Sequence, residues 1–278
     1  MQKKQRIVIT GGNTGIGLAT AANLSARGHA VIIACRNQSK AQEAIDSIRA
    51  QQPDADIEAR SLDLASFDSI RTFSKQLVTD YPIIDVLINN AGAYPTRQQF
   101  TAEGFELQFG VNYLGHVLLT DLLLPALEAS SDARIVHLSS IMHNLGKIDF
   151  SSFKGRKRYS GTAAYGQSKL ANLLFSNELA RRLPASITSN AVHPGGVDSD
   201  IYRELPSALH WFLRLFLIST KRAGAYVADM AVSPKWHGRS GEFKSAHGPL
   251  PVSRHGRNAA LAERLYLESC VLVDVSPR

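Results

Sequence analysis

The sequence predicts an α/β fold in which a doubly wound parallel sheet of about seven strands carries helices on both faces. Three observations support this fold. Short β-branched and apolar runs alternate with helical patterns along the chain. These runs are almost wholly apolar, as expected for strands that are covered on both faces. A glycine-rich turn separates the first run from the first helical pattern.

The first half of the chain repeats a strand–helix unit. β-Branched runs predict strands at residues 6–10, 30–35, 57–62 and 84–89. Helical periodicity predicts helices at residues 18–27 and 39–50, and a third from about residue 67 to residue 80. Gly28 follows the first helix and is typical of a helix C-terminus. Because a helix separates each strand from the next, we expect the strands to run parallel.

The second half continues the pattern with longer helices. A helix at residues 102–127, with a weak point near Pro125, precedes a strand at 134–138. A strongly periodic helix at 163–182 precedes a strand at 187–192. The irregular and very apolar segment 202–218 follows. The remaining expected elements are a helix at 222–232, a short strand at 241–244 and a surface helix at 258–269. Without repeats or linkers, residues 1–278 predict one domain.

Composition sets limits on the class of protein. Apolar residues make up 44% and charged residues 20% of the chain, which is ordinary for a globular protein. The two cysteines, Cys35 and Cys270, form no plausible disulfide framework. The sequence has no cluster of Cys and His residues of the kind that binds a metal. The N-terminus runs directly into a strand, so we expect no signal peptide. We also find no window that approaches the roughly 18 uninterrupted apolar residues that a membrane span needs. These features predict a cytoplasmic protein.

The formal net charge of +7 raises the question of an anionic partner. Basic residues are scattered, apart from a cluster at Lys154, Arg156, Lys157 and Arg158. This cluster is either a solvated loop or a contact for a phosphate or a membrane surface. No nucleic-acid-binding motif accompanies it, so we expect no nucleic-acid partner.

The glycine-rich turn runs from Thr10 to Gly17 and leads directly into the first helix. Such a turn places backbone N–H groups and a helix N-terminus against a phosphate. Glycine is required where a side chain would block the approach of the backbone to a pyrophosphate. We therefore expect a dinucleotide site of the Rossmann type here rather than a purely structural turn. The expected cofactor contacts in the turn are Gly11, Asn13, Thr14, Gly15, Ile16 and Gly17.

The glycine spacing resembles the TGxxxGxG signature of the short-chain dehydrogenase/reductase family, and further motifs of that family follow in order. They are Asp63 and Leu64, the run Asn89, Asn90, Ala91 and Gly92, then Asn112, Ser139 and Ser140, Tyr165 with Lys169, and Pro194 with Gly195 and Val197. The resemblance extends from Arg6 to about Ser199. Outside the turn, it implies cofactor contacts by Asp63, Leu64, Asn90, Ala91, Gly92, Tyr165, Lys169, Pro194, Gly195 and Val197.

The end of the second predicted strand indicates which nicotinamide cofactor is bound. A carboxylate there would bind the ribose 2′-hydroxyl of NAD, whereas an arginine accommodates the 2′-phosphate of NADP. Arg36 follows this strand, and no carboxylate does. Lys40, one turn into the next helix, adds a second positive charge. Arg36 is either an ordinary surface residue or the phosphate contact, and we predict the latter, with NADP(H) as cofactor.

Tyr165 and Lys169 are four residues apart on a predicted helix, so their side chains share one face. A nearby ammonium favours the phenolate and brings the pKa of a tyrosine toward neutrality. The resemblance implies that Tyr165 exchanges the proton of the reacting oxygen and that Lys169 binds the nicotinamide ribose. It also implies that Ser140 binds the substrate oxygen, and that Asn112 holds a water of a proton relay. Asn112 also suits a structural role between its helix and the fourth strand.

Two residues depart from the family pattern, and other histidines lie near the motifs. His137 stands where the family has asparagine, and Ser199 replaces a threonine. Neither change removes a catalytic group. His143 and His193 are each either structural or part of a substrate pocket, and no metal is expected because no ligand motif is present.

The apolar segment at about residues 199–220 occupies the place of the family's substrate-binding loop. Trp211, Phe212, Leu215 and Phe216, within 205–218, suit a substrate lid, a membrane-facing patch or a contact with the core or another subunit. This segment and the sequence motifs that include Thr10 and Tyr165 most resemble those of retinol dehydrogenases. The resemblance implies a lipophilic alcohol, aldehyde or ketone as substrate.

Two functions of different class remain. The first is an NADP(H)-dependent oxidoreductase, which the complete set of Ser140, Tyr165 and Lys169 favours. The second is a cofactor-binding regulatory or scaffold protein of the same fold. The resemblance further implies homo-oligomers that pack through the helices of Asn112 and Tyr165.

Overall fold

The computed structural model describes residues 3–195 and 219–278. At its centre is a seven-stranded sheet with the strand order β3-β2-β1-β4-β5-β6-β7, and all neighbouring strands run parallel. The strands are β1 (Arg6–Thr10), β2 (Ala30–Cys35), β3 (Ile57–Ser61), β4 (Val86–Asn89), β5 (Ala133–Leu138), β6 (Ile187–His193) and β7 (Phe243–Ser245). The predicted doubly wound α/β fold is therefore confirmed.

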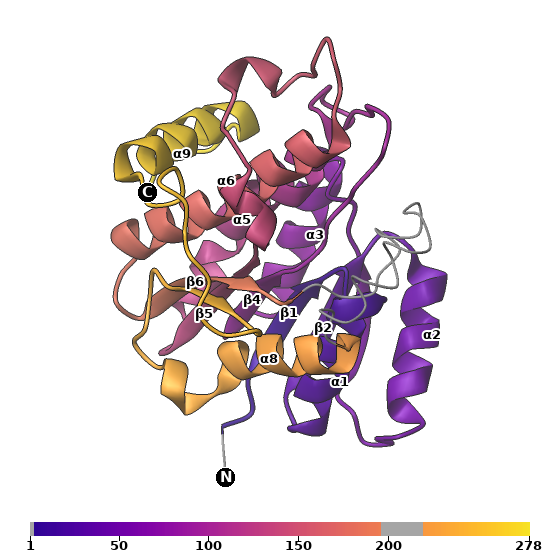
Figure 1. The fold of residues 1–278 in the computed structure, drawn as a ribbon. Coiled ribbons are helices and arrows are strands. Elements are labelled where there is room, and N and C mark those ends of the chain that lie inside the picture. Colours follow the sequence, from indigo (N-terminus) through magenta and orange to yellow (C-terminus); the bar gives the residue numbers. More distant parts are fainter. Residues whose placement is uncertain (1–2, 196–218) are drawn as a thin grey trace.

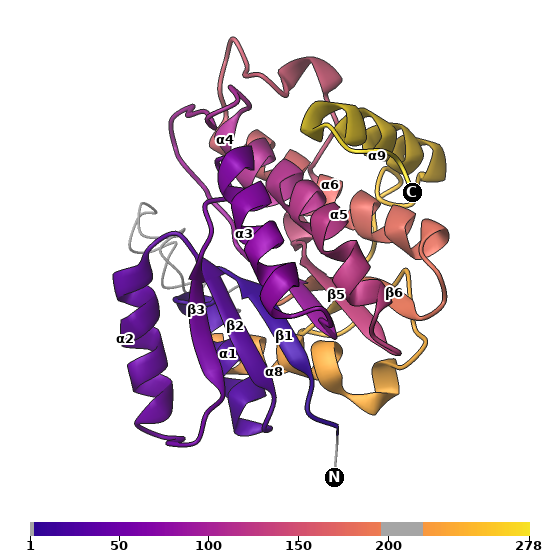
Figure 2. The same cartoon turned by 180° about the vertical axis from the view of Figure 1, so that it is seen from behind.

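Helices cover both faces of the sheet (Figures 1 and 2). One face carries α1, α2 and α8, and the other carries α3, α5 and α6, with α9 packed outside α5 and α6. The bounds are α1 (Gly15–Ala26), α2 (Gln38–Arg49), α3 (Phe67–Asp80), α4 (Leu107–Phe109), α5 (Gly115–Glu128), α6 (Gly161–Arg182), α8 (Thr220–Val232) and α9 (Ala259–Val273). Single-turn helices are η1 (Gly110–Leu114), η2 (Ile141–Asn144), η3 (Phe150–Ser152) and η5 (Pro234–Trp236).

The core follows the alternation of side chains along each strand. In β1, Val8 points into the cluster beneath α3 and α5, whereas Ile7 and Ile9 point into the cluster beneath α1 and α8. In β4, Leu87 and Ile88 divide between the two clusters in the same way. Burial on both faces explains why the strands read as continuous apolar runs.

The long helix begins later than predicted. The expected start at residue 102 is wrong, because residues 100 and 106 form an antiparallel bridge and the helix begins at Leu107. The carboxylate of Glu106 accepts hydrogen bonds from the backbone N–H groups of Gln108 and Phe109 and so caps the new start. A π-helical turn, η1, then separates α4 from α5. Pro125 does not end α5, which continues to Glu128.

By length and composition, the helical run Leu107–Glu128 could cross a membrane, with a mean hydropathy of 1.2 in its most apolar stretch. However, 78% of that stretch is buried inside the protein. A helix that is apolar on all sides is typical of a protein core, and we assign this run to the core.

The C-terminal helix is longer and more buried than the predicted surface helix. α9 ends at Val273 rather than at residue 269, and it buries Leu265, Tyr266 and Cys270 against the rest of the protein. α9 therefore covers α5 and α6, the two helices through which the family resemblance implied subunit contacts. Cys35 and Cys270 are both buried free thiols.

Candidate active site

The glycine-rich turn lies at the carboxyl edge of the sheet, between β1 and α1. Gly11 and Gly15 have φ angles of +65° and +56°, a region that side chains disfavour. A Cβ atom on Gly17 would lie 2.3 Å from the backbone oxygen of Gly11. Gly11 and Gly15 thus permit the turn, and Gly17 permits α1 to pack directly onto it.

The residues that follow β4 form hydrogen bonds to this turn. The side-chain amide of Asn90 donates to the backbone oxygens of Thr10 and Gly11 at 2.7 and 3.3 Å. The backbone N–H groups of Asn90 and Ala91 both donate to Oγ1 of Thr10 at 2.9 Å. The Asn90 side chain is therefore engaged within the protein. Sequence reasoning missed the role of Thr10, although Thr10 begins the motif.

A hollow of about 430 Å³, here called the carboxyl-edge hollow, lies beside the turn. Eight of the predicted cofactor contacts line it, namely Gly11, Asn13, Thr14, Arg36, Asp63, Leu64, Ala91 and Gly92. Lining residues that were not predicted include Cys35, Asn37, Ala93, Gln99, Leu107 and Val111. No local motif marks these six, which come together only through the fold. Val197 and residues 205–218 lie outside the described residues.

The remaining predicted contacts belong to α1, to α6 and to the residues that follow β6. Gly15, Ile16 and Gly17 form the first turn of α1. Pro194 and Gly195 directly follow β6, and Gly195 has a φ angle of +107°. Tyr165 and Lys169 lie on α6.

Two cations line the carboxyl-edge hollow at the end of β2. Arg36 is exposed, and Lys40 lies in the first turn of α2, where its backbone N–H donates to Oδ1 of Asn37 at 2.9 Å. Neither side chain forms an ion pair with a described residue. Among the described residues that line the hollow, the one carboxylate is that of Asp63, whose Oδ1 accepts from the backbone N–H of Ala65. This part of the hollow therefore suits an anion, which the N-terminus of α2 also favours.

Lys169 is buried beside Tyr165 on α6. Its Nζ lies 5.4 Å from the centroid of the Tyr165 ring and donates to the backbone oxygen of Leu138 at 3.0 Å. The residue is only 4% exposed, and this burial lowers the pKa of Lys169 to about 8. Ser139 donates to the backbone oxygen of Lys169 at 2.8 Å, so its hydroxyl is used within the fold.

Asn112 lies in the π-helical turn and connects three segments. Its Oδ1 accepts from the backbone N–H of Ala93 at 2.6 Å, and its Nδ2 donates to the oxygen of Ala93 at 3.1 Å. Nδ2 also donates to Oγ of Ser168, the neighbour of Lys169, at 3.0 Å. A Cβ on Gly92 would lie 3.5 Å from Oδ1 of Asn112 and 3.8 Å from Nζ of Lys169. The fold thus brings Asn112 and Lys169 to the rim of the carboxyl-edge hollow.

Ser140 follows β5 and begins η2. Its hydroxyl accepts from the backbone N–H of Met142 at 3.2 Å, and its backbone oxygen lies 2.6 Å from Nδ1 of His143. His143 and His193 are both buried. Burial is the largest cause that lowers the pKa of His193, to about 4. No group of three metal ligands occurs among residues 3–195 and 219–278.

Tyr94 is a neighbour of Tyr165 that sequence reasoning missed. The two rings meet edge to face with centroids 5.1 Å apart, and the Tyr94 hydroxyl lies 3.0 Å from Oγ1 of Thr162. Only the position of Tyr94, two residues after Gly92, could have marked it. Tyr94 forms one wall beside the predicted catalytic tyrosine.

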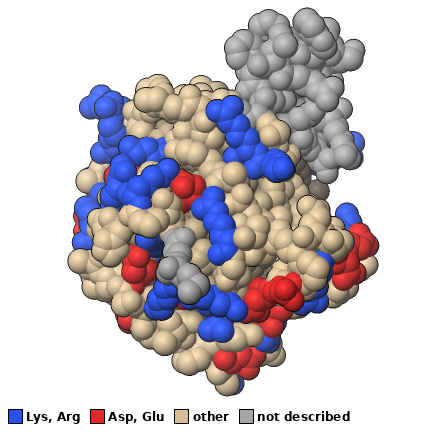
Figure 3. All heavy atoms as spheres, turned by 90° about the horizontal axis from the view of Figure 1, so that it is seen from below, with Lys and Arg blue, Asp and Glu red and all other residues tan. Residues whose placement is uncertain are grey.

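In the basic cluster that begins at Lys154, the side chains of Lys154, Lys157 and Arg158 are exposed, as in a solvated loop, and Arg156 is partly buried. Arg156 donates to Oε1 of Gln167 at 2.8 Å and approaches Asp149 to 3.7 Å, so it joins the loop to α6. Elsewhere, Lys and Arg side chains on the face seen in Figure 3 are spread among acidic and uncharged residues. The net charge is therefore not gathered into one patch on that face.

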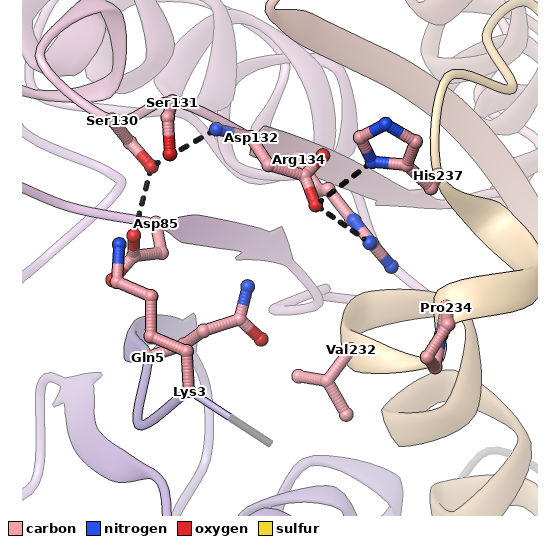
Figure 4. A pocket seen from close by; sticks show the side chains of 10 residues that line it. All are labelled: Lys3, Gln5, Asp85, Ser130, Ser131, Asp132, Arg134, Val232, Pro234 and His237. Atoms are coloured by element: carbon pink, nitrogen blue, oxygen red, sulfur yellow. Dashed lines mark hydrogen bonds and ion pairs between the residues drawn. The ribbon is translucent and has the colours of Figure 1, made fainter. Parts of the chain in front are cut away.

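A second pocket of about 230 Å³, here called the amino-edge pocket, lies at the opposite edge of the sheet (Figure 4). Asp132 contacts Arg134 at 2.9 Å and Nδ1 of His237 at 3.3 Å. Asp85 accepts from Oγ of Ser130 and from the backbone N–H of Arg6, both at 2.8 Å. Asp132 therefore pairs with charged side chains, whereas Asp85 is bonded to a hydroxyl and a backbone N–H group.

Comparisons with known proteins agree with this geometry. Residues 5–209 match the family described as short chain dehydrogenase. Retinol dehydrogenase 12 of Mus musculus is 44% identical over 272 residues, which cover 97% of this chain and 86% of that protein. The crystal structure of an uncharacterized protein from Mycobacterium Paratuberculosis is 35% identical with a TM-score of 0.80, and the match covers 99% of this chain and 95% of that chain.

A solved short chain dehydrogenase from Shigella flexneri 2a str. 301, complexed with NADP, has a TM-score of 0.72 at 20% identity. The match covers 88% of this chain and 98% of that chain. At this identity the likeness concerns the fold alone.

Proposed function

The chain belongs to the short-chain dehydrogenase family and is similar to retinol dehydrogenases, and on this basis we propose that it is an NADP(H)-dependent enzyme acting on a lipophilic substrate. Family membership makes it an oxidoreductase of alcohols and carbonyls. The observation that carries the finer proposal is the convergence of Tyr165, Lys169 and Asn112 beside the carboxyl-edge hollow. In this proposal Tyr165 is the general acid and base.

The residues of the carboxyl-edge hollow fit NADP(H). The backbone of the glycine turn and the N-terminus of α1 would hold the pyrophosphate. Arg36 and Lys40 would hold the 2′-phosphate, because neither cation forms an ion pair with a described residue and no carboxylate replaces them at the end of β2. When bound, the nicotinamide supplies or accepts the hydride. The NADP complex of the Shigella flexneri neighbour supports this fit at the level of the fold.

The protein's own contribution is proton transfer and positioning. Tyr165 would donate its proton to the carbonyl oxygen during reduction and take it back from the alcohol during oxidation. The ammonium of Lys169 stabilises the phenolate that remains. With its pKa lowered to about 8, Lys169 both carries a proton and releases it near neutral pH. Ser140 would bind the reacting oxygen, and Asn112 keeps its side chain beside Ala93 and Ser168.

The substrate class rests on the relatives and on composition. A relative named retinol dehydrogenase favours a lipophilic alcohol or carbonyl, and the apolar run at 205–218 agrees with that. A substrate lid, a peripheral membrane contact and a subunit contact remain alternatives for this run, which lies outside the described residues. The two buried thiols suit a reducing compartment, and we propose the cytoplasm.

Any homo-oligomer of this chain would use a surface other than the faces of α5 and α6 that α9 covers. Leu265, Tyr266 and Cys270 of α9 occupy those faces. We therefore propose that self-association, if it occurs, involves the outer face of α9 or another part of the molecule.

The deciding experiment measures the loss of NADPH absorbance across a panel of carbonyls, with NADH in parallel. The panel runs from short aliphatic aldehydes to retinoid and steroid carbonyls. Turnover of bulky apolar carbonyls with a preference for NADPH supports the proposal. Tight NADPH binding without turnover of any member would instead favour a regulatory or scaffold protein of this fold.

A further inference from the structure

His116, in the first turn of α5, has both ring nitrogens bonded inside the protein. The residue is 1% exposed. Its Nε2 lies 2.9 Å from Oγ1 of Thr10, and its Nδ1 lies 3.0 Å from the backbone oxygen of Asn112. Among the buried histidines of the described residues, each of the others leaves one ring nitrogen without a hydrogen-bond partner. These others are His29, His137, His143 and His193. His116 therefore differs from them in its bonding rather than in its burial.

The partners of His116 determine where its proton lies. A backbone oxygen only accepts hydrogen bonds, so Nδ1 carries the hydrogen. Burial lowers the pKa of His116 to about 4, which leaves the ring neutral and Nε2 as an acceptor. The hydroxyl of Thr10 then donates to Nε2 at 2.9 Å in preference to the backbone oxygen of Ile88 at 3.4 Å, while the same oxygen accepts from the N–H groups of Asn90 and Ala91. The charged or titratable groups that act on the ring are Lys169 and His137.

This arrangement connects the cofactor turn to the predicted proton relay. Thr10 ends β1 immediately before the glycine turn, and its hydroxyl holds the backbone that follows β4. Asn112 lies in the π-helical turn and bonds to Ala93 and Ser168. A π-helical turn is an irregularity within an α-helix that is frequent at functional sites. The His116 ring joins this turn to Thr10 of β1.

We propose that His116 is a positioning residue, which through its Nδ1–H bond to the Asn112 carbonyl holds Asn112 and hence Lys169 in register with the cofactor turn. The inference rests on the proposed function, since it concerns the same proton relay. Thr10 fixes the tautomer that this bond requires, as a hydrogen bond to one ring nitrogen of a histidine determines the role of the other.

The tautomer is tested first, on the full chain, by ¹⁵N NMR of labelled histidine. The expected result is a neutral His116 with its hydrogen on Nδ1 at pH 6, identified by the signal that disappears in His116→Gln. A hydrogen on Nε2 overturns the inference, because Nδ1 would then face the Asn112 oxygen without a proton. This measurement needs no turnover.

Kinetics of two conservative variants test the positioning role. The amide nitrogen of asparagine lies close to the place of Nδ1, so His116→Asn keeps a donor for Asn112, whereas glutamine reaches only toward the place of Nε2. We expect His116→Gln to lower kcat by about 10-fold to 100-fold with little change in NADPH affinity. We expect His116→Asn to stay within about threefold of the unchanged chain, by the same reasoning.

The pH profile separates positioning from loss of stability. In His116→Gln, the pH at which kcat falls by half should shift, because Asn112 and Lys169 no longer keep their relative positions. In His116→Asn, this pH should stay the same. His29→Gln is the matched control, since His29 is equally buried but lies at the amino end of β2 and binds only the backbone N–H of Gln5. This control should leave kcat and the pH profile unchanged.

The outcomes distinguish the two proposals. Absence of turnover in the unchanged chain overturns the proposed function and this inference with it. Turnover that His116→Gln leaves unaltered, pH profile included, overturns the inference alone. Equal losses in His116→Gln and His116→Asn also overturn it, because the bond to Asn112 would then not be the feature that matters.

Discussion

The two edges of the sheet both carry a hollow lined by charged residues, but they use these charges differently. In the amino-edge pocket, Asp132 pairs with Arg134 and His237, and Asp85 is bonded to Ser130 (Figure 4). In the carboxyl-edge hollow, Arg36 and Lys40 line the wall without forming an ion pair with a described residue. Charges that satisfy one another contribute to stability, whereas charges left unpaired are available to a ligand. The contrast agrees with the rule that open α/β sheets bind ligands at the carboxyl ends of their strands.

The largest expected effect is loss of catalysis at the carboxyl edge without loss of stability. Tyr165→Phe removes the proton that the reacting oxygen needs, and kcat should fall by about 10³-fold to 10⁴-fold. NADPH affinity, measured by fluorescence titration, should change little. Tyr226→Phe on α8 is a control of the same chemistry remote from the site. Unimpaired turnover in Tyr165→Phe would show that another group transfers the proton.

At the amino edge we expect the opposite result, a loss of stability without a loss of catalysis. Arg134 is buried and bonds both Asp132 and the backbone oxygen of Ser233. Arg134→Met should lower the free energy of unfolding by about 3 kcal/mol, because it leaves a partly buried carboxylate without its main partner. Urea denaturation measures this loss, and Arg239→Met, which breaks the exposed pair with Glu242, should cost much less. A change in kcat of the folded Arg134→Met protein would contradict the division of roles between the two edges.

Burial of Lys169 makes stability depend on pH at the carboxyl edge. Its pKa is lowered to about 8 from 10.5, so between these values the unfolded chain binds more protons than the folded one. Stability relative to Lys169→Met should therefore rise by about 2 to 3 kcal/mol as the pH increases through this window. Below pH 8 the difference between the two proteins should be constant, because the cost of the buried cation is then fully present. A constant difference up to pH 10.5 would show that Lys169 titrates like an exposed lysine.

The smallest of the four effects concerns Arg36, one of the two cations of the carboxyl-edge hollow. Arg36→Asp replaces the proposed 2′-phosphate contact with a carboxylate that suits a ribose hydroxyl. The ratio of kcat/KM for NADPH to that for NADH should fall by about 100-fold, in line with the loss of charge-assisted hydrogen bonds. Parallel assays with the two cofactors measure it. If the ratio does not change, Arg36 is an ordinary surface residue and the contrast between the edges loses its main support.

Local patterns in the sequence determined the sheet and much of the site. Apolar runs located the strands because a strand covered on both faces admits few polar residues, as in Ala30–Cys35. The glycine spacing located the turn because its backbone requires positive φ angles at Gly11 and Gly15. The spacing of Tyr165 and Lys169 placed both on one face of α6 because a helix turns once in 3.6 residues.

Features that depend on contacts between distant residues were decided only by the tertiary structure. The start of the long helix at Leu107 follows from the Glu106 cap, and Glu106 is held by Phe153, whose backbone oxygen accepts from its N–H, and by the hydroxyl of Tyr159, which donates to its carboxylate. The burial of α9 on α6 joins segments that are far apart in the sequence. The bond of His116 to Thr10 likewise depends on how α5 lies against β1, whereas its bond to Asn112 is local to the helical run. Periodicity and spacing report the conformation of one segment, whereas such contacts arise only once separate segments share a common core.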